Sequence, residues 1–254
     1  MFPKWLNKLF PVDPDEPAPE WGRHTADEGG VSSTTFGASD IAGLRTKIVC
    51  HACNTGWMSK LEARAEPVLT PMVSGEPVTL DRDQQVLVAT WATKTAMVFE
   101  PTLTNLDPFT EEQCSIVRTQ DHPPGSTVIY LGAVEGPIAP MGYWCAKVHL
   151  VLGDSPFRNY HFHTLHVGPL VMHVLRMEPP PSGYGSFEAV EVPREVDISY
   201  DLATKIFLPT GNAPWPPKRV LGWNGLVALT RRELDMPEEW TPPGPHWAEE
   251  SRDS

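Results

Sequence analysis

The residues with the clearest capacity for chemistry are Cys50 and Cys53, in the run KIVCHACNTGWMSKLE at positions 47–62. A CxxC turn between a strand and a helix lets two thiolates converge on one metal ion, about 2.3 Å from a zinc. A redox dithiol is the weaker interpretation, because Asn-Thr-Gly follows the second cysteine and no βαβ pattern surrounds the pair. Tetrahedral zinc takes four ligands, so the pair supplies half of a site.

The remaining cysteines and two nearby histidines are weaker candidates for metal ligands. Cys114 and Cys145 are isolated in the sequence, and we expect each to be a small buried hydrophobic side chain. His51 lies inside the CxxC turn, where we expect its side chain to point to solvent. His24 lies in an expected long loop, from which it could swing toward the turn.

A second group of histidines lies in the C-terminal half of the chain. His161 and His163 occupy alternate positions of one expected strand and therefore share a face, with His149 and His173 on other strands. Two such imidazoles can chelate a metal ion. No carboxylate follows these histidines at a spacing that would support a metal site. We therefore expect them to be polar residues on the solvent-facing side of an antiparallel strand.

Short elements surround the cysteine pair. Residues 46–49 (TKIV) predict a strand that leads into it, and residues 57–65 predict a helix that ends before Pro67. Residues 11–40 are rich in Pro, Gly and Ser and predict a loop, and residues 70–79 predict a turn-rich connector.

The strongest helix pattern covers residues 81–100. Asp81 and Gln84 have the spacing of a capping box, and apolar residues surround most of the circumference, so we expect a buried helix. Lys94 is its one interior positive charge. We expect its ammonium to reach the surface, with a paired or functional lysine as the alternative. A second, shorter helix is predicted for residues 110–119.

Beyond residue 124 the hydrophobic period changes to two, which is typical of strands. The expected strands are residues 126–134, 143–153, 160–167, 170–178, 187–192 and 203–208. Several short strands without intervening helices predict an antiparallel sheet or a small barrel. A terminal helix is predicted for residues 223–234.

Composition limits the class of protein. The 254 residues include 28 prolines, roughly twice the usual share, which excludes an all-helical bundle because an interior proline costs about 3 kcal/mol. The net charge is −12, and half of it lies in a Pro-rich tail over residues 233–254. This balance gives no support for the basic face of a non-specific nucleic-acid binder.

Two features bear on localisation. No run approaches the roughly 18–20 apolar residues of a membrane span, and Phe2, Trp5, Leu6 and Leu9 form one face of a short amphipathic turn. We expect this turn to dock on its own domain rather than on a membrane surface. Four cysteines do not make a disulfide scaffold, so we expect a cytoplasmic, reducing setting.

The run Cys50-His51-Ala52-Cys53-Asn54-Thr55-Gly56-Trp57-Met58 resembles the second zinc knuckle of HNH-type (ββα-metal) nucleases. Phe2-Pro3-Lys4-Trp5-Leu6 is similar to the FPxWL stretch of that lineage, and residues 83–97 resemble its helical segment. The resemblance covers roughly residues 1–100. It implies that Cys50 and Cys53 are structural zinc ligands and that Asn54 lies at a catalytic-metal position.

The chain departs from this family where catalysis depends on it. The family's first CxxC and its Glu-His pair, whose histidine is the general base, would fall immediately before Met1. Loss of a general base alone forfeits about 10²–10⁴-fold in rate. Either the reading frame begins further upstream, which the DNA would show, or the protein is a degenerate descendant with another role.

The sequence therefore predicts an α+β protein with four parts: a zinc-knuckle module of HNH-like ββα type (1–66), a helical segment (67–120), a β-rich domain (121–232) and the acidic tail (233–254). The expected function is that of an HNH-endonuclease-lineage protein that acts on nucleic acid and is catalytically incomplete, with Mg²⁺ or Mn²⁺ as the catalytic metal if it cleaves. The alternative is a non-catalytic zinc-knuckle protein that binds a protein partner or has a structural role.

Overall fold

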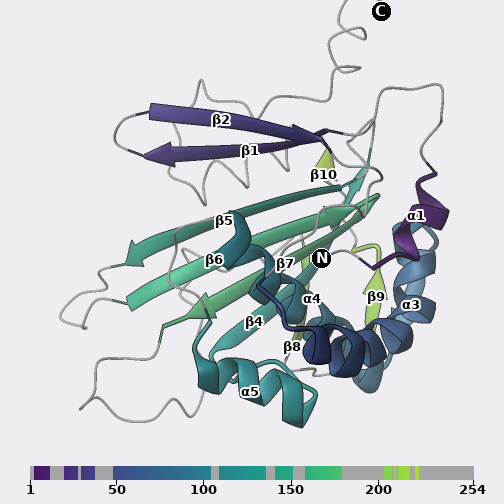
Figure 1. Cartoon of the computed structure of the whole chain (residues 1–254). Coiled ribbons are helices and arrows are strands. Elements are labelled where there is room, and N and C mark those ends of the chain that lie inside the picture. Colours follow the sequence, from purple (N-terminus) through teal and green to yellow (C-terminus); the bar gives the residue numbers. More distant parts are fainter. Residues whose placement is uncertain are drawn as a thin grey trace, which may run out of the picture.

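The computed structural model places a layer of helices against a mainly antiparallel sheet (Figure 1). It describes residues 3–11, 20–27, 30–37, 48–103, 109–135, 141–150, 158–178, 203–207, 209, 211–217 and 221–222. The fold is α+β, as the sequence predicts, and the C-terminal half forms the sheet. The strand expected at 187–192, the helix expected at 223–234 and the acidic tail lie outside the described residues.

The structure confirms the two helices that the sequence predicts for residues 81–100 and 110–119. The helices are α1 (Leu6–Leu9), α2 (His51–Cys53), α3 (Ser59–Val73), α4 (Arg82–Leu103) and α5 (Glu111–Gln120), with a π-helical turn over Asn54–Met58. A capping box starts α4: the Gln84 N–H donates to Asp81 Oδ1 at 2.9 Å, and the Asp81 N–H donates to Gln84 Oε1 at 3.0 Å. Thr110 starts α5 in the same way. None of the described helices is long and apolar enough to cross a membrane.

Helix α3 is longer than the sequence predicts, because it continues through Pro67 and Pro71. These prolines lie four residues apart on the outer side, so the lost N–H groups weaken one side of the helix only. On the inner side Leu69 and Met72 are fully buried, which contributes about 1.5–3 kcal/mol for each side chain. This burial offsets the cost of the prolines, and the first part of the connector expected at 70–79 is helical.

The predicted loop over residues 11–40 is wrong where an antiparallel hairpin forms. Strand β1 (Glu20–Asp27) pairs with β2 (Gly30–Gly37) along its whole length. Backbone hydrogen bonds hold such a pair whatever the side chains are, and glycines at both ends of β2 obscure the alternation that periodicity depends on. In Figure 1 the hairpin lies on the side of the main sheet that β5 borders.

The main sheet has the strand order β10-β4-β7-β6-β5, and β8 also pairs with β4. Its strands are β4 (Thr127–Glu135), β5 (Met141–Leu150), β6 (Arg158–Val167), β7 (Leu170–Met177), β8 (Ala203–Phe207) and β10 (Leu221–Gly222). Every pairing is antiparallel except that of β10, which runs parallel to β4. A separate antiparallel pair joins β3 (Val78–Leu80) to β9 (Ala213–Trp215).

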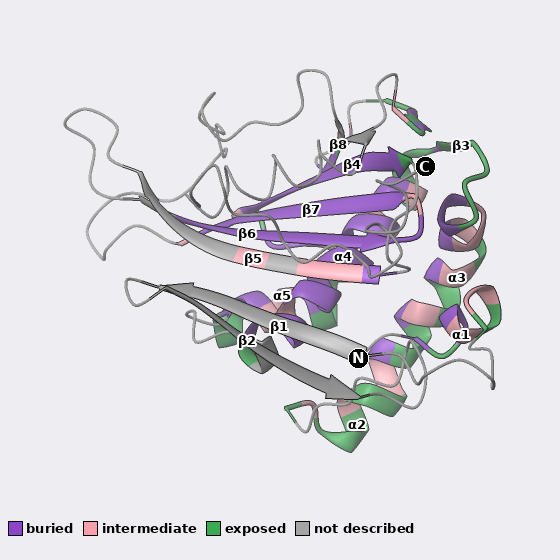
Figure 2. Ribbon diagram, turned by 90° about the horizontal axis from the view of Figure 1, so that it is seen from above, coloured by how far each residue is buried: buried purple, intermediate pink, exposed green. Residues whose placement is uncertain are grey.

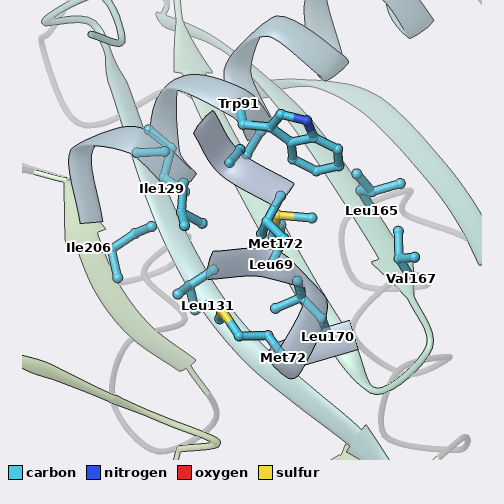
Figure 3. Packing of buried hydrophobic residues seen from close by; sticks show 14 of the residues in the cluster. Leu69, Met72, Trp91, Ile129, Leu131, Leu165, Val167, Leu170, Met172 and Ile206 are labelled. Carbon is cyan, nitrogen blue, oxygen red and sulfur yellow. The ribbon is translucent and has the colours of Figure 1, made fainter. Parts of the chain in front are cut away.

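One hydrophobic core joins the helices to the sheet. Leu69 of α3 and Trp91 of α4 lie over Leu131 and Met172 of the sheet (Figure 3). Trp5 belongs to the same buried cluster, so the N-terminal turn docks on its own fold as expected.

The turn between β6 and β7 fixes the end of α3 against the sheet. Gly168 has a φ of +53°, a backbone conformation that residues other than glycine rarely adopt. A Cβ atom on this residue would lie 2.6 Å from the carbonyl oxygen of Val73, the last residue of α3. Glycine is therefore required here by both its dihedral angle and the close approach of the helix.

Both faces of the central strands are buried. All residues of β7, and all of β4 apart from its last residue, have little exposure, as the purple ribbons of Figure 2 show. Side chains alternate across a strand, so polar residues on either face of these strands have to find their partners inside the protein.

Candidate functional site

The two cysteines of the sequence motif lie together at the start of a helical segment. Cys50 has an extended backbone and caps α2, and its Sγ accepts a hydrogen bond from the Cys53 N–H at 3.3 Å. Cys50 is exposed and Cys53 is half-buried. The strand predicted before them is wrong at Ile48 and Val49, where the chain bends. The loop enters the helix so that both sulfurs lie near the surface.

The helix behind the cysteines is interrupted and then anchored. Gly56 has non-helical dihedral angles (φ −94°, ψ −109°) inside the π-helical turn, and Thr55 Oγ1 donates to the His51 carbonyl at 2.9 Å. Met58, the last residue of this turn, is buried, and so is Leu61 in the helix that follows. The cysteines are therefore presented at the outer end of an element whose other end is fixed.

The environment of Cys50 favours the thiolate. Hydrogen bonds from the backbone N–H of Cys53 and from the Cys53 side chain lower the pKa of the Cys50 thiol below its usual value. A thiolate is the form that binds metal or attacks a disulfide. Asn54, the predicted catalytic-metal position, follows directly and is exposed.

The donor set fits half of a zinc site. Within the described part of the chain, no three His, Cys, Asp or Glu side chains are grouped so that they could hold a metal ion. His51 is exposed, as expected. His24 lies in β1 rather than in a loop, and its side chain is outside the described residues. Cys50 and Cys53 can thus provide two of the four ligands that structural zinc requires.

The Lys94 ammonium does not reach the surface, so the expectation of an exposed lysine is wrong. The alternative expectation, a lysine paired with another side chain, is confirmed. Its side chain is 2% exposed, and Nζ donates to Glu62 Oε1 at 2.9 Å. Nζ also lies 5.3 Å from the centroid of the Trp91 ring. Burial lowers the pKa of Lys94, and the Glu62 carboxylate partly restores it. This pair connects α4 to α3, the helix that follows the cysteines.

The second set of predicted residues lies in a buried polar cluster between α4 and the sheet. His161 and His163 are 0% and 1% exposed, so the expected wet strand face is wrong. Glu100 of α4 meets both of them: its Oε1 lies 3.2 Å from His161 Nδ1 and 3.7 Å from His163 Nε2. Arg176 of β7 donates to the same oxygen at 3.0 Å.

The cluster extends at both ends. His161 Nε2 lies 2.7 Å from Glu178 Oε1, so each ring nitrogen of His161 faces a carboxylate oxygen. At the other end, the Tyr143 hydroxyl is hydrogen-bonded to His163 Nδ1 at 2.8 Å. The guanidinium of Arg176 supplies the buried cation that the buried Glu100 carboxylate requires.

Burial sets the protonation of this cluster. Burial by itself would raise the pKa of Glu100, but the hydrogen bond with His161 and the charges around it, including Arg176, hold that pKa below its usual value. Burial lowers the pKa of His163 to about 3 and raises that of Tyr143 well above its usual value. His163 is therefore neutral at pH 7, and its contact with Glu100 is not an ion pair.

The opposite face of the sheet holds further buried histidines. The Thr164 hydroxyl and His173 Nδ1 are 2.8 Å apart, on neighbouring strands. Burial lowers the pKa of His173 to about 3 and that of His166 to about 4. His149 lies in β5, but its side chain is outside the described residues.

The sequence did not single out Glu100, Arg176, Glu178 or Tyr143. A signal was present for two of them, because Glu100 ends an apolar helix face and Arg176 interrupts the apolar run of β7. A charge within a buried pattern indicates a buried partner.

The two isolated cysteines are less buried than predicted. Cys114 and Cys145 are each half-buried rather than fully buried. The Cys114 thiol lies 3.8 Å from the Phe109 carbonyl oxygen, and burial raises its pKa.

Comparisons with protein-family models, with curated proteins and with solved structures found no match for this chain. The site therefore has to be interpreted from its own geometry.

The buried histidines predict acid-sensitive stability. His163, His166 and His173 are neutral in the folded protein and protonate readily once unfolded, so their contribution is present above about pH 6.5 and is lost as the pH falls toward their folded pKa values of about 3 to 4. Each should lower the free energy of unfolding by about 1.4 kcal/mol per pH unit within this window. Urea unfolding midpoints measured from pH 7.5 to 5 should fall steeply.

His173→Gln supplies the matched variant, because an amide can still pair with Thr164 but does not titrate. In this variant the unfolding free energy should change with pH about one third less steeply than in the unmodified protein. The exposed His51→Gln should leave that pH dependence unchanged. A midpoint that stays constant over this range would show that the buried rings do not control stability.

Removing either partner of the Lys94–Glu62 pair should have unequal effects. Glu62→Leu leaves the ammonium of Lys94 buried without its carboxylate and should cost about 3 kcal/mol of unfolding free energy. Lys94→Met removes the buried charge, while Glu62, 27% exposed, still reaches water, so the cost should stay below about 1.5 kcal/mol. Urea denaturation at pH 7 measures both.

The exposed ion pair Arg64–Asp121 provides the control. Arg64→Ala should change stability by less than about 1 kcal/mol. Equal losses for Glu62→Leu and Lys94→Met would contradict the assignment of the cost to an unpaired buried lysine.

Proposed function

We propose that this chain is a zinc-knuckle protein of the HNH-nuclease lineage that acts on nucleic acid, with Cys50 and Cys53 as two ligands of a structural zinc and with incomplete catalytic machinery. The observation that carries the proposal is the arrangement of the two thiols: they lie three residues apart at the start of a helical segment, near the surface, with the Cys53 N–H bonded to the Cys50 sulfur.

Zinc would add a cross-link that the fold needs at this point. The segment from Ile48 to Thr55 has little burial of its own, and structural zinc sites supply folding free energy where a hydrophobic core cannot. The four free cysteines fit a reducing, cytoplasmic setting, which we include in the proposal.

The nucleic-acid role rests on the resemblance and on the order of the elements. A hairpin (β1, β2) precedes the knuckle helix, as in a ββα unit. In Figure 1, however, the hairpin lies on the side of the main sheet that β5 borders, and away from α3. A catalytic site shared between hairpin and helix gains no support from this arrangement, which favours the alternative of a non-catalytic protein that binds through its knuckle.

Zinc content tests the proposal directly. Purified protein should contain zinc in a fixed ratio to chain, and Cys50→Ser or Cys53→Ser should abolish it, because either change removes one of two adjacent thiolate ligands. Cys114→Ser, in a half-buried thiol away from the knuckle, is the matched control and should retain the metal. Protein that folds without zinc and takes up none on titration would refute the proposed knuckle.

Plasmid nicking separates the enzyme from the binder. We expect no nicking above background in Mg²⁺ or Mn²⁺, because no three His, Cys, Asp or Glu side chains among the described residues are grouped so that they could hold a catalytic metal ion. Asn54→Ala is the matched variant, as its exposed side chain lies at the predicted catalytic-metal position. Nicking that requires Mg²⁺ or Mn²⁺ and disappears in Asn54→Ala would show that the chain is a nuclease and that its machinery is complete.

A further inference from the structure

Among the described residues, the proposed knuckle offers two metal ligands with exposed neighbours. Cys50 is exposed, and so are the neighbouring His51, Ala52 and Asn54. Figure 2 shows α2 in green at the edge of the molecule. Tetrahedral zinc bound by Cys50 and Cys53 alone would have two open positions, whereas structural zinc sites are closed by four protein ligands.

An exposed apolar side chain lies beside the knuckle. Among the described residues one large hydrophobic side chain is exposed, Ile48 at 47%, and it lies two positions before Cys50. Isolated exposed apolar side chains are common. This one, however, lies two positions before Cys50, so a surface that contacts the exposed cysteine would also meet Ile48.

We propose that a second copy of this chain completes the site, so that one zinc ion is held by Cys50 and Cys53 of two protomers. This rests on the proposed zinc knuckle and extends it by naming the source of the missing ligands. A two-fold axis through the zinc relates the two cysteine pairs, and two-fold dimers are the commonest assemblies of identical chains. Four thiolates then surround the metal, one of the standard structural donor sets.

The fold presents the knuckle in a manner suited to such a contact. Leu61, Ala65 and Leu69 fix α3 to the core, each at 2% exposure or less. The cysteines lie at the free end of this anchored segment, so two copies can approach through their knuckles without disturbing either core. Ile48 of each protomer would be covered in the contact, which adds apolar burial to the metal link.

The test is the zinc dependence of the oligomeric state of the full chain. Light scattering after gel filtration should show a monomer in chelator and a dimer on titration with Zn²⁺, with an end point at about one zinc per two chains. Co²⁺ in place of Zn²⁺ should give the charge-transfer absorption of a four-thiolate site. Cys50→Ser should remain monomeric in Zn²⁺, and Cys114→Ser should dimerise normally.

Ile48→Asp tests the apolar part of the contact without removing a ligand. It should raise the protein concentration needed for zinc-dependent dimerisation by about tenfold, because a charged side chain replaces a covered apolar one. An unchanged concentration dependence would remove Ile48 from the contact.

The other outcomes separate the two proposals. A monomer that binds one zinc per chain would overturn the shared site but leave the knuckle intact, because ligands from the same chain would then complete it. A dimer that persists in chelator and in Cys50→Ser would overturn the shared site as well. Absence of zinc binding would overturn both.

Discussion

Helix α4 packs against both the sheet and α3, so its buried charged side chains Lys94 and Glu100 have to find their partners inside the protein. An unpaired buried charge costs several kcal/mol, and this requirement determines which elements meet α4. Lys94 is matched by Glu62 from α3, and Glu100 by Arg176 from β7 and His161 from β6. One helix thus connects the N-terminal helical part to the sheet by two buried polar contacts on different sides.

These contacts relate the cysteine pair to the rest of the fold. Glu62 lies on α3, one turn beyond the buried Met58, and its bond to Lys94 holds this part of the helix to α4. The cysteines are outside the region that the core stabilises. Small peripheral modules use a metal cross-link where apolar burial is insufficient, and the proposed zinc site at Cys50 and Cys53 would supply such a link.

The buried histidines have a different role in the architecture. Four of them lie on the two central strands β6 and β7, and they occupy both faces of the sheet. Hydrogen-bonded polar groups within a core favour one register, because a shift of one residue would move each of them to the other face and away from its partner. The pairing of Thr164 with His173 across the two strands is of this kind. The same burial keeps the rings of His163, His166 and His173 neutral, so the packing of these strands depends on neutral imidazoles at those three positions.

Local sequence determined much of the fold: the capping boxes at Asp81 and Thr110, the buried character of α4 and the alternating strands of the C-terminal half, because each depends on contacts within a few residues. It also singled out Cys50 and Cys53, whose spacing alone brings the two sulfurs together.

Tertiary structure decided how far α3 extends and which residues pair with the buried charges, because hydrophobic periodicity carries no information on either. Burial against the sheet carried α3 through Pro67, and α3 placed a carboxylate beside Lys94. Glu100 and Arg176, 76 positions apart, became partners only when α4 packed on the sheet, and the same packing brought Glu100 to His161 and His163. A pattern of side chains indicates which face is buried, but only the packed elements determine which charge lies opposite.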